Sequence, residues 1–425
     1  MVNIVQPSIK TTKEFHFEDV KENKFSNGLP YYIIKAGEQE IIKVDFLFDA
    51  GMVFNENPLV AELTNELLEA GTSKKTSEEI AEELDFYGAY LELDISQHFS
   101  IVSFYTLNKY FSETLSIVEH IIFNANFPKH EINICLQNKL QRYKISRQKT
   151  EVISQELFLE NIFGSSHPYG RNITEEDFES INQKDIMNFY SDRYNLSNLK
   201  ILISGNVKEE HIIKLEKLFG EGKIKEKANN KDIDIKSNVK TKKVFSEIAE
   251  TMQSSIKIGK ETINKHHPDF FNLSISSIIL GGYFGSRLMT NIREDKGYTY
   301  GIHSTNMSIQ EAGFFMISAA SGKDVYEKAI IEIYKELKIL RTELVSEKEL
   351  QRVKNYLTGT LAKMFDGVFA KSNVFLALLT YNLNFNYYQK YFEIIKTISP
   401  EIIKATAEKY LNENDMIEVV VGAKS

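Results

Sequence analysis

Both halves of the sequence end with the same local pattern, a helix that is followed by a hydrophobic strand and a glycine. In the first half, helical spacing over residues 183–193 leads into residues 199–204 and Gly205. In the second half, a similar helical stretch leads into residues 417–421 and Gly422, about 217 positions later. Solenoid repeats are only about 20–50 residues long, so a period of this length indicates a duplicated domain. A chain of 425 residues has room for two such domains.

Within each half, stretches typical of strands alternate with stretches typical of helices. Residues 31–36 and 41–49 are rich in β-branched and aromatic side chains, as strands are. Long helical patterns cover residues 108–122 and 130–163. Strands that cluster apart from the helices predict an α+β fold of two similar domains, each a mainly antiparallel sheet with helices packed on one face.

The composition changes between the two halves. Large apolar residues are rare from residue 221 to 243, and lysine is frequent there. Such a segment is typical of a linker, although a long surface loop within one domain has the same composition. We therefore predict an N-terminal α+β domain over residues 1–222, a linker over 223–243 and a C-terminal α+β domain over 244–425.

The charge and hydropathy of the chain argue against several classes of protein. The 51 Lys and Arg residues are outnumbered by 59 Asp and Glu residues, and a net charge of −8 does not favour binding of nucleic acid. No run of about 18 apolar residues is present, so no membrane span is expected. The first residues lack the features of a signal peptide, which predicts a cytoplasmic protein, or a periplasmic one if a signal peptide was removed.

Familiar catalytic and metal-binding patterns are missing. The nine His residues include no pair spaced four apart, and the adjacent His266 and His267 fit the surface-exposed start of a helix. Cys135 is the only cysteine, which rules out an intrachain disulfide, and its helical surroundings predict an inert buried thiol. Gly281 and Gly282 do not fit a phosphate-binding loop and predict a turn between two helices.

One segment places two carboxylates on a single helix face. Glu62 and Glu66 are four residues apart, and Asn65 lies beside them in the pattern. Taken alone, this segment predicts a solvated amphipathic helix.

A second segment brings an arginine near two tyrosines. A helix is predicted over residues 286–295 that ends at Gly297, and the strand that follows places Tyr298 and Tyr300 on one face. Arg293 and Tyr300 then converge on one cleft, where a guanidinium and a phenol can bind peptide carbonyls or an oxyanion. The alternative is an ordinary surface arginine and a packed tyrosine.

Taken together, these segments resemble the insulinase and mitochondrial processing peptidase family. The resemblance extends along almost the whole chain and depends on the order and spacing of short motifs rather than on any single one. The motifs are Asn27-Gly28-Leu29, Asp49-Ala50-Gly51, Glu69-Ala70-Gly71-Thr72, His167-Pro168-Tyr169-Gly170 and Ser286-Arg287-Leu288, followed by Arg293-Glu294 and Tyr300.

Active members of that family carry the inverted zinc motif His-x-x-Glu-His. The matching positions here are Glu62, Asn65 and Glu66, so both histidine ligands and the catalytic base are replaced. A further glutamate ligand of the family would fall near residues 141–143, which contain no carboxylate, and the substrate-binding edge strand differs at residues 91–92. The resemblance therefore implies a lost zinc site and a chain that binds no metal or other cofactor itself.

The arginine and the tyrosine of the family remain. In two-subunit relatives, the subunit without zinc supplies such a pair to the active site of its partner. The resemblance implies that this chain is a zinc-less subunit, inactive alone, that supplies Arg293 and Tyr300 to a zinc-bearing homologue. Tyr298, Gly281 and Gly282 are then expected to contact the peptide substrate. The expected assembly is a heterodimer with zinc in the partner, or a homodimer if no partner is present.

Two other interpretations stay open. Zinc-less core proteins of respiratory complexes belong to the same family, so the chain can be a structural subunit with no role in peptide cleavage. It can also be a divergent active metalloprotease that uses Glu62 and Glu66 on an ion harder than zinc, because two carboxylates without histidine suit such an ion.

Overall fold

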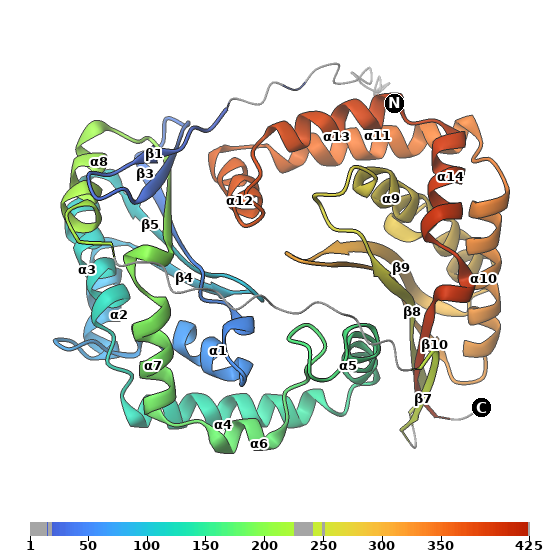
Figure 1. The fold of residues 1–425 in the computed structure, drawn as a ribbon, viewed down its shortest axis with the longest axis horizontal. Coiled ribbons are helices and arrows are strands. Elements are labelled where there is room, and N and C mark those ends of the chain that lie inside the picture. Colours follow the sequence, from blue (N-terminus) through green and yellow to red (C-terminus); the bar gives the residue numbers. More distant parts are fainter. Residues whose placement is uncertain (1–14, 16–18, 225–240, 249–250, 424–425) are drawn as a thin grey trace, which may run out of the picture.

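The described strands form two sheets, one from each half of the chain (Figure 1). The structure is a computed structural model that describes residue 15 and residues 19–224, 241–248 and 251–423. Residues 225–240 of the predicted linker over 223–243 lie outside the described residues, so the domain limits that the linker defines stay predictions.

The sheet of the first half, sheet 1, has the strand order β1-β2-β6-β3-β5-β4, and the sheet of the second half, sheet 2, has the order β7-β11-β8-β10-β9. The strands of sheet 1 are β1 (Asn23–Lys24), β2 (Pro30–Lys35), β3 (Ile41–Phe48), β4 (Tyr90–Ile95), β5 (Ser100–Leu107) and β6 (Leu199–Gly205). Those of sheet 2 are β7 (Lys243–Glu247), β8 (Gln253–Thr262), β9 (Thr299–Ser308), β10 (Gly313–Gly322) and β11 (Ile417–Gly422).

The two sheets share one topology. When β2 to β6 and β7 to β11 are numbered within their own halves, both sets follow the order 1-5-2-4-3. In both sets the first and last strands pair in parallel, and the other neighbours pair antiparallel. This arrangement confirms the predicted α+β class of two similar, mainly antiparallel sheets. The repeated strands that end the two halves, β6 and β11, occupy equivalent positions.

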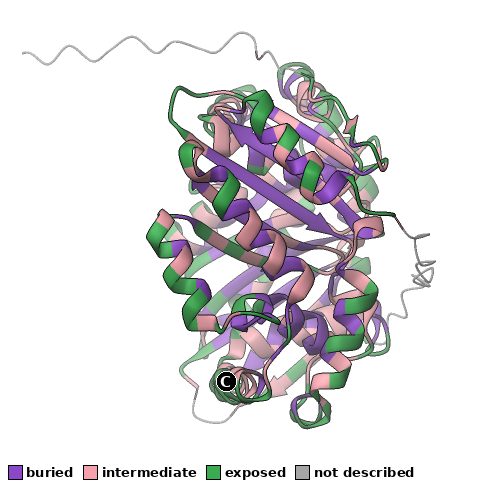
Figure 2. Cartoon of the chain, turned by 90° about the vertical axis from the view of Figure 1, so that its left-hand side faces the viewer, coloured by how far each residue is buried: buried purple, intermediate pink, exposed green. Residues whose placement is uncertain are grey.

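Helices of the same half pack on one face of each sheet, as the sequence predicts. On sheet 1 these are α1 (Pro58–Glu66), α2 (Ser77–Tyr87), α3 (Phe111–Asn124), α7 (Gln183–Arg193) and α8 (Glu209–Leu215), with α4 (Lys129–Ser146) and α6 (Glu175–Ser180) beside α1. On sheet 2 they are α9 (Phe270–Ser277), α10 (Tyr326–Thr342), α11 (Glu347–Met364), α13 (Asn386–Thr397) and α14 (Pro400–Tyr410). The strands are largely buried, whereas the helices alternate between buried and exposed residues (Figure 2).

One helix of each half packs on the opposite sheet. α5 (Thr150–Phe163) comes from the first half and contacts β8 and β11, where Phe158 joins a core that includes Phe314. α12 (Val368–Leu379) comes from the second half and contacts β2 and β6, where Phe375 is buried. Each sheet therefore lies between helices of its own half and one helix of the other half, and this exchange ties the two halves together.

The exchange explains one difference from the sequence-based expectation. The pattern over residues 130–163 predicts a single helix, but the structure divides it into α4 and α5 at residues 147–149. Lys149 has extended backbone angles, φ −93° and ψ 120°, and neither glycine nor proline marks the break. The break is caused by tertiary packing. α5 must leave the first half in order to cover the face of sheet 2 that the helices of the second half leave open.

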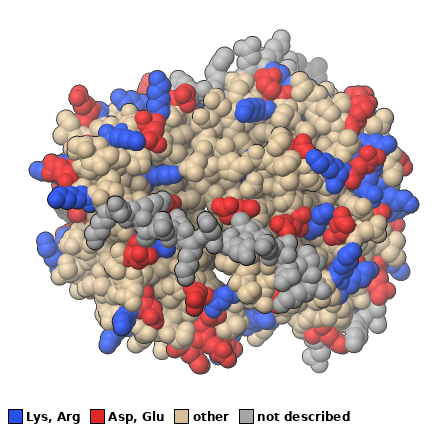
Figure 3. Space-filling model, viewed as in Figure 1, with Lys and Arg blue, Asp and Glu red and all other residues tan. Residues whose placement is uncertain are grey.

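The surface carries charges of both signs. Lys and Arg side chains lie among Asp and Glu side chains over the face seen in Figure 3. In the part of the chain that the structure describes, no helix has the length and apolar character needed to cross a membrane.

Candidate functional site

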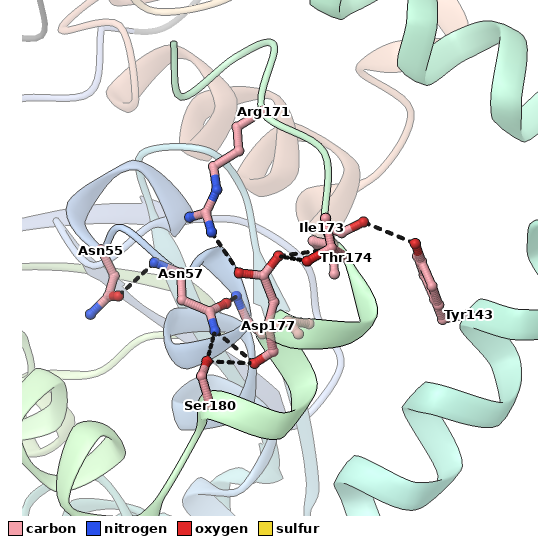
Figure 4. Close-up of polar contacts among 9 residues, drawn as sticks. Asn55, Asn57, Tyr143, Arg171, Ile173, Thr174, Asp177 and Ser180 are labelled. Carbon is pink, nitrogen blue, oxygen red and sulfur yellow. Dashed lines mark hydrogen bonds and ion pairs between the residues drawn. The ribbon is translucent and has the colours of Figure 1, made fainter. Parts of the chain in front are cut away.

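Helix α1, which carries the positions of the degenerate zinc motif, begins at a well-anchored N-terminus. The side-chain oxygen of Asn57 accepts a hydrogen bond from the backbone N–H of Leu59 at 3.0 Å, which caps the helix. The side-chain amide of Asn57 also donates to the backbone oxygen of Asp177 at 2.8 Å. Arg171 forms an ion pair of 2.6 Å with the Asp177 carboxylate (Figure 4). These contacts fix the start of α1 against α6.

A lysine of the chain itself bridges the two carboxylates of α1. Lys139 Nζ, on α4, lies 2.5 Å from Glu62 Oε1 and 2.6 Å from Glu66 Oε2. Burial opposes the charged form of Lys139, but the hydrogen bonds to both carboxylates outweigh burial and raise its pKa. An ammonium group therefore occupies the space between the two positions where the family's motif would place histidine ligands.

Cys135 lies beside this bridge without being activated by it. Its thiol donates a hydrogen bond to Glu66 Oε1 at 3.4 Å. Burial and the negative charge of Glu66 raise the pKa of the thiol to about 12, so it stays protonated at neutral pH. Within the described ranges, no group of three or more His, Cys, Asp or Glu side chains is arranged to hold a metal ion.

Asn65, at the position of the family's catalytic base, points into the core instead of toward the two carboxylates. It is 2% exposed, and its side-chain amide donates to Ser100 Oγ at 2.5 Å. Ser100 Oγ in turn lies 2.7 Å from the hydroxyl of Tyr194, whose pKa burial raises to about 12. The sequence pattern places Asn65 beside Glu62 and Glu66, but the structure separates it from them, because residue 65 of α1 faces sheet 1.

The position of the family's further glutamate ligand is also occupied by other groups. The Tyr143 hydroxyl donates to the backbone oxygen of Ile173 at 3.1 Å, and Arg142 lines a cavity of about 610 Å³ next to Glu66. Lys139 lies one helical turn before these residues and therefore on the same face of α4. Counting from Glu66 along the sequence to the expected position of the further glutamate ligand therefore leads to the face of α4 that carries Lys139. A lysine on that face is the signal that could have identified the bridge.

Arg293 lies in the second half, in a π-helical segment over Met289–Asp295. Its guanidinium is 5.1 Å from the ring centre of Phe284, and that ring is 66% exposed. Arg293 is half-buried and forms no ion pair with a described carboxylate. Its donors are therefore available to a ligand at the surface.

Tyr300 is the extra residue of a β-bulge at the start of edge strand β9. Gly301 pairs with Ala320 and Thr299 pairs with Ser321, so Tyr300 has no partner residue on β10. The Thr299 hydroxyl lies 2.6 Å from the backbone oxygen of Ala320, and the backbone N–H of Gly301 donates to this hydroxyl at 3.1 Å. These contacts fix the bulge, and the Tyr300 side chain is 86% exposed.

The bulge separates the two tyrosines that the sequence pattern predicts on one strand face. Tyr298 precedes β9 and is half-buried against the core of the second half, with its backbone N–H bonded to Ile292 at 2.9 Å. Tyr300 instead projects outward. The two tyrosines therefore present different amounts of surface to a ligand.

Gly281 and Gly282 lie in a π-helical segment over Ile278–Gly282. A Cβ at Gly281 would lie 2.6 Å from the backbone nitrogen of Ser304, so packing alone requires glycine there. The sequence predicts a turn at this place, whereas the structure continues the helix that starts as α9. A contact between these glycines and a substrate stays a prediction, as do those of Tyr298, Arg293 and Tyr300.

The structure places the two segments singled out in the sequence in different halves of the molecule. α1 packs on sheet 1, and β9 belongs to sheet 2 (Figure 1). Tyr300 lies on β9, and Arg293 lies in the π-helical segment that precedes it. Within the described residues, the positions of the degenerate zinc motif, joined to Lys139, are therefore separate from the segment that carries the half-buried Arg293 and the exposed Tyr300.

Comparison with known proteins gives a consistent picture. Residues 180–357 match the family model described as Peptidase M16 inactive domain. A Bacillus subtilis relative named Uncharacterized zinc protease YmxG is 26% identical over 293 residues, which make up 68% of this chain and 70% of that protein. A Helicobacter pylori relative named Non-peptidase homolog YmxG is 20% identical over 381 residues, 88% of this chain and 87% of that protein.

Two further proteins are similar to part of the chain or share its fold. The Probable mitochondrial-processing peptidase subunit beta of Schizosaccharomyces pombe is 22% identical over 225 residues, 50% of this chain and 48% of that protein. The crystal structure of a peptidase M16 inactive domain from Pseudomonas fluorescens superposes with a TM-score of 0.84 at 22% identity. That match covers 96% of this chain and 98% of the other, so the two share one fold throughout.

Proposed function

We propose that this chain, which belongs to the peptidase M16 family, is the zinc-less, non-catalytic subunit of a metallopeptidase of the processing-peptidase type. In this proposal it binds extended peptides together with a zinc-bearing homologue, to whose active site it supplies Arg293 and Tyr300. Cytoplasmic location, the expectation from the sequence, stays a prediction.

The observation that carries the proposal is the bridge from Lys139 to Glu62 and Glu66. A divalent ion between these carboxylates would have to displace an ammonium that is hydrogen-bonded to both of them. It would then find two carboxylates without an imidazole, and Asn65 cannot act as a general base. This argues against the divergent active metalloprotease.

The exposure of Tyr300, next to the half-buried Arg293, supports a role at the surface of a partner. The zinc of the partner would polarise the scissile carbonyl and activate water. Tyr300, whose hydroxyl has no hydrogen-bond partner among the described residues, would donate to the developing oxyanion or to a neighbouring peptide carbonyl. Arg293 would bind another carbonyl of the peptide.

A structural subunit without any role in peptide cleavage is the second candidate. The name of the Helicobacter pylori relative, Non-peptidase homolog, favours it. The two candidates differ in one requirement, because only a peptidase subunit needs the Tyr300 hydroxyl.

The test is to combine this chain with a zinc-bearing homologue from the same organism and to measure cleavage of an unfolded peptide. Tyr300→Phe keeps the ring and removes the hydroxyl, so the complex should assemble while turnover falls about 10²–10³-fold. Tyr356→Phe, at another exposed tyrosine of the second half, serves as the control. Wild-type turnover by Tyr300→Phe in an intact complex would leave only the structural subunit.

A further inference from the structure

The inner faces of the two sheets, each covered by the helix from the other half, contain buried charges at equivalent places. β3 of sheet 1 and β8 of sheet 2 are the second strands of their halves in the shared topology. On β3, Asp45 pairs with Ser103 of β5, and on β8, Lys257 pairs with Ser318 of β10. The duplicated fold therefore offers an internal comparison of how a buried charge is neutralised.

In sheet 1 the fold neutralises the charge completely. Lys43 Nζ lies 2.8 Å from Asp45 Oδ1, and the side chains are 2% and 0% exposed. Lys43 also donates to Asn373 Oδ1 of α12 at 2.6 Å, while the hydroxyl groups of Ser103 and Ser372 donate to Asp45. A buried ion pair is tolerated when its remaining donors and acceptors are satisfied in this way.

In sheet 2 the equivalent charge lacks a counter-ion. Lys257 is 3% exposed, and its Nζ lies 2.6 Å from Ser318 Oγ. Two residues earlier on β8, where β3 has its counter-charge, stands Ser255, whose hydroxyl bonds to Ser154 of α5 at 2.8 Å. Among the described residues, no carboxylate lies within ion-pair distance of Lys257. A single serine oxygen does not balance a buried ammonium.

The described ionisable groups near Lys257 do not form an ion pair with it. Burial lowers the pKa of Lys257, and Glu151 at the start of α5 acts in the opposite direction. Burial also lowers the pKa of His303, and the positive charge of Lys257 lowers it further. His303 pairs with Ser318 on the other side, so Lys257, Ser318 and His303 form one row across three strands.

Two residues of this row, Ser318 and His303, line a cavity of about 690 Å³ at the N-terminal end of α5, and Lys257 is connected to it through its hydrogen bond to Ser318. Ser318, His303, Ser255 and Glu151 supply polar lining, while Met252 and Met289 supply an apolar part of the wall. Gly301 and Ile302 of β9 also line it, and β9 is the edge strand of sheet 2. The backbone of an edge strand is available to pair with an extended peptide.

We propose that this cavity binds the carboxylate of an extended peptide, and that the peptide C-terminus is the source of that carboxylate. Ser318 and His303 are the contacts in the cavity wall, and Lys257, hydrogen-bonded to Ser318, is the buried positive charge behind them. The carboxylate supplies in sheet 2 the negative charge that Asp45 supplies in sheet 1. The methionine side chains accommodate the last apolar side chain of the peptide, since flexible thioethers adapt to different shapes. The inference concerns the isolated chain and does not depend on the proposed partner.

The test is calorimetric titration of the isolated full chain with matched apolar peptides. A peptide with a free C-terminal carboxylate should bind at least tenfold more tightly than the same peptide with an amidated C-terminus. Acetate alone should compete weakly. Tighter binding of an amidated peptide with an internal glutamate, or of inorganic phosphate, would overturn the assignment to the peptide C-terminus.

The variant Lys257→Met tests whether Lys257 is responsible for the preference for a free carboxylate. Replacing a buried, unpaired ammonium by an apolar side chain of similar length should leave the melting temperature unchanged or raise it. Preference for the free carboxylate should nevertheless be lost. Lys260→Met changes another lysine of β8, which pairs with Asp415, and should keep that preference. Equal binding by the wild type and Lys257→Met in a folded protein would overturn the proposal.

Discussion

Lys139 Nζ lies 2.6 Å from Glu66 Oε2, so the position of a family metal ligand is joined to a cation that belongs to the protein. The same ammonium also contacts Glu62, and it thereby ties α4 to α1. The two glutamates stand four apart on one helix face, where like charges repel each other. The bridge converts this repulsion into an attraction between two helices.

Lys139→Met should destabilise the protein, because it leaves Glu62 and Glu66 facing each other without a cation. The lysine is 14% exposed and the glutamates are 30% and 45% exposed, so solvent screens part of the interaction. We expect a loss of about 1 kcal/mol in the free energy of unfolding, measured with urea. Lys144 lies on the same helix as Lys139 and forms an exposed pair with Glu175 of α6. Lys144→Met removes that pair and should cost at most about 0.5 kcal/mol. Equal losses for both variants would contradict a special role of the bridge.

The purified chain should contain no stoichiometric transition metal and should leave unfolded peptides intact on its own. The physical reason is that the degenerate motif offers two carboxylates already paired with Lys139, and no imidazole. Elemental analysis of the purified protein measures this directly. About one zinc per chain, lost together with peptidase activity upon chelation, would contradict the zinc-less assignment.

Arg293→Ala should mainly weaken binding of the peptide in the reconstituted complex. If Arg293 binds a peptide carbonyl equally in the ground state and the transition state, KM rises while kcat changes little. Arg293→Lys keeps the charge but not the planar, forked donor geometry, so it should restore binding only in part. Steady-state kinetics at several peptide concentrations separate the two parameters. A fall in kcat with unchanged KM would instead assign Arg293 to the transition state.

Much of the fold could be predicted from the sequence, because strand and helix periodicity are local properties. The structure contains the strands predicted over residues 31–36 and 41–49 as β2 and β3, and the strands that end the two halves as β6 and β11. Their bounds differ from the predicted ones by at most one residue. The exchange of α5 and α12 could not be predicted, since an apolar helix pattern does not reveal which sheet the helix covers.

The candidate site divides in the same way. The loss of the zinc motif is a matter of residue identity and can be read directly at Glu62, Asn65 and Glu66. The bridge from Lys139 and the inward orientation of Asn65 depend on how α1 packs against α4 and sheet 1. The unpaired Lys257 becomes visible only when the partners of a buried charge are known.

The motif His167-Pro168-Tyr169-Gly170 joins the end of α5 to the turn between β4 and β5. The Tyr169 hydroxyl lies 2.5 Å from His98 Nε2, and Tyr169 is 4% exposed. A Cβ at Gly170 would lie 2.4 Å from the backbone oxygen of Gly164, so this tight turn requires glycine. Burial lowers the pKa of His98 to about 4, although Asp49 acts in the opposite direction. His98 is therefore neutral in the folded protein near neutral pH.

The burial of His98 should make the folded state sensitive to mild acid. In the unfolded chain a histidine has a pKa of about 6.5, so the unfolded chain binds a proton at this residue below that pH. In the folded chain His98 binds the proton only near pH 4, so protonation favours the unfolded state between these two pH values. The stabilisation is complete above pH 6.5 and is lost as the pH falls toward 4. Allowing for partial exposure, we expect a loss on the order of 2 kcal/mol from this group.

Comparison of the wild type with His98→Gln isolates this effect from the carboxylates that titrate in the same range. His98→Gln should lower the free energy of unfolding at pH 7, because the contact with Tyr169 is weakened, but the difference from the wild type should shrink between pH 6.5 and 4. His130→Gln, at a side chain that is 72% exposed, should run parallel to the wild type at every pH. If His98→Gln also runs parallel, the histidine is not held neutral by burial, and the acid sensitivity must come from other groups.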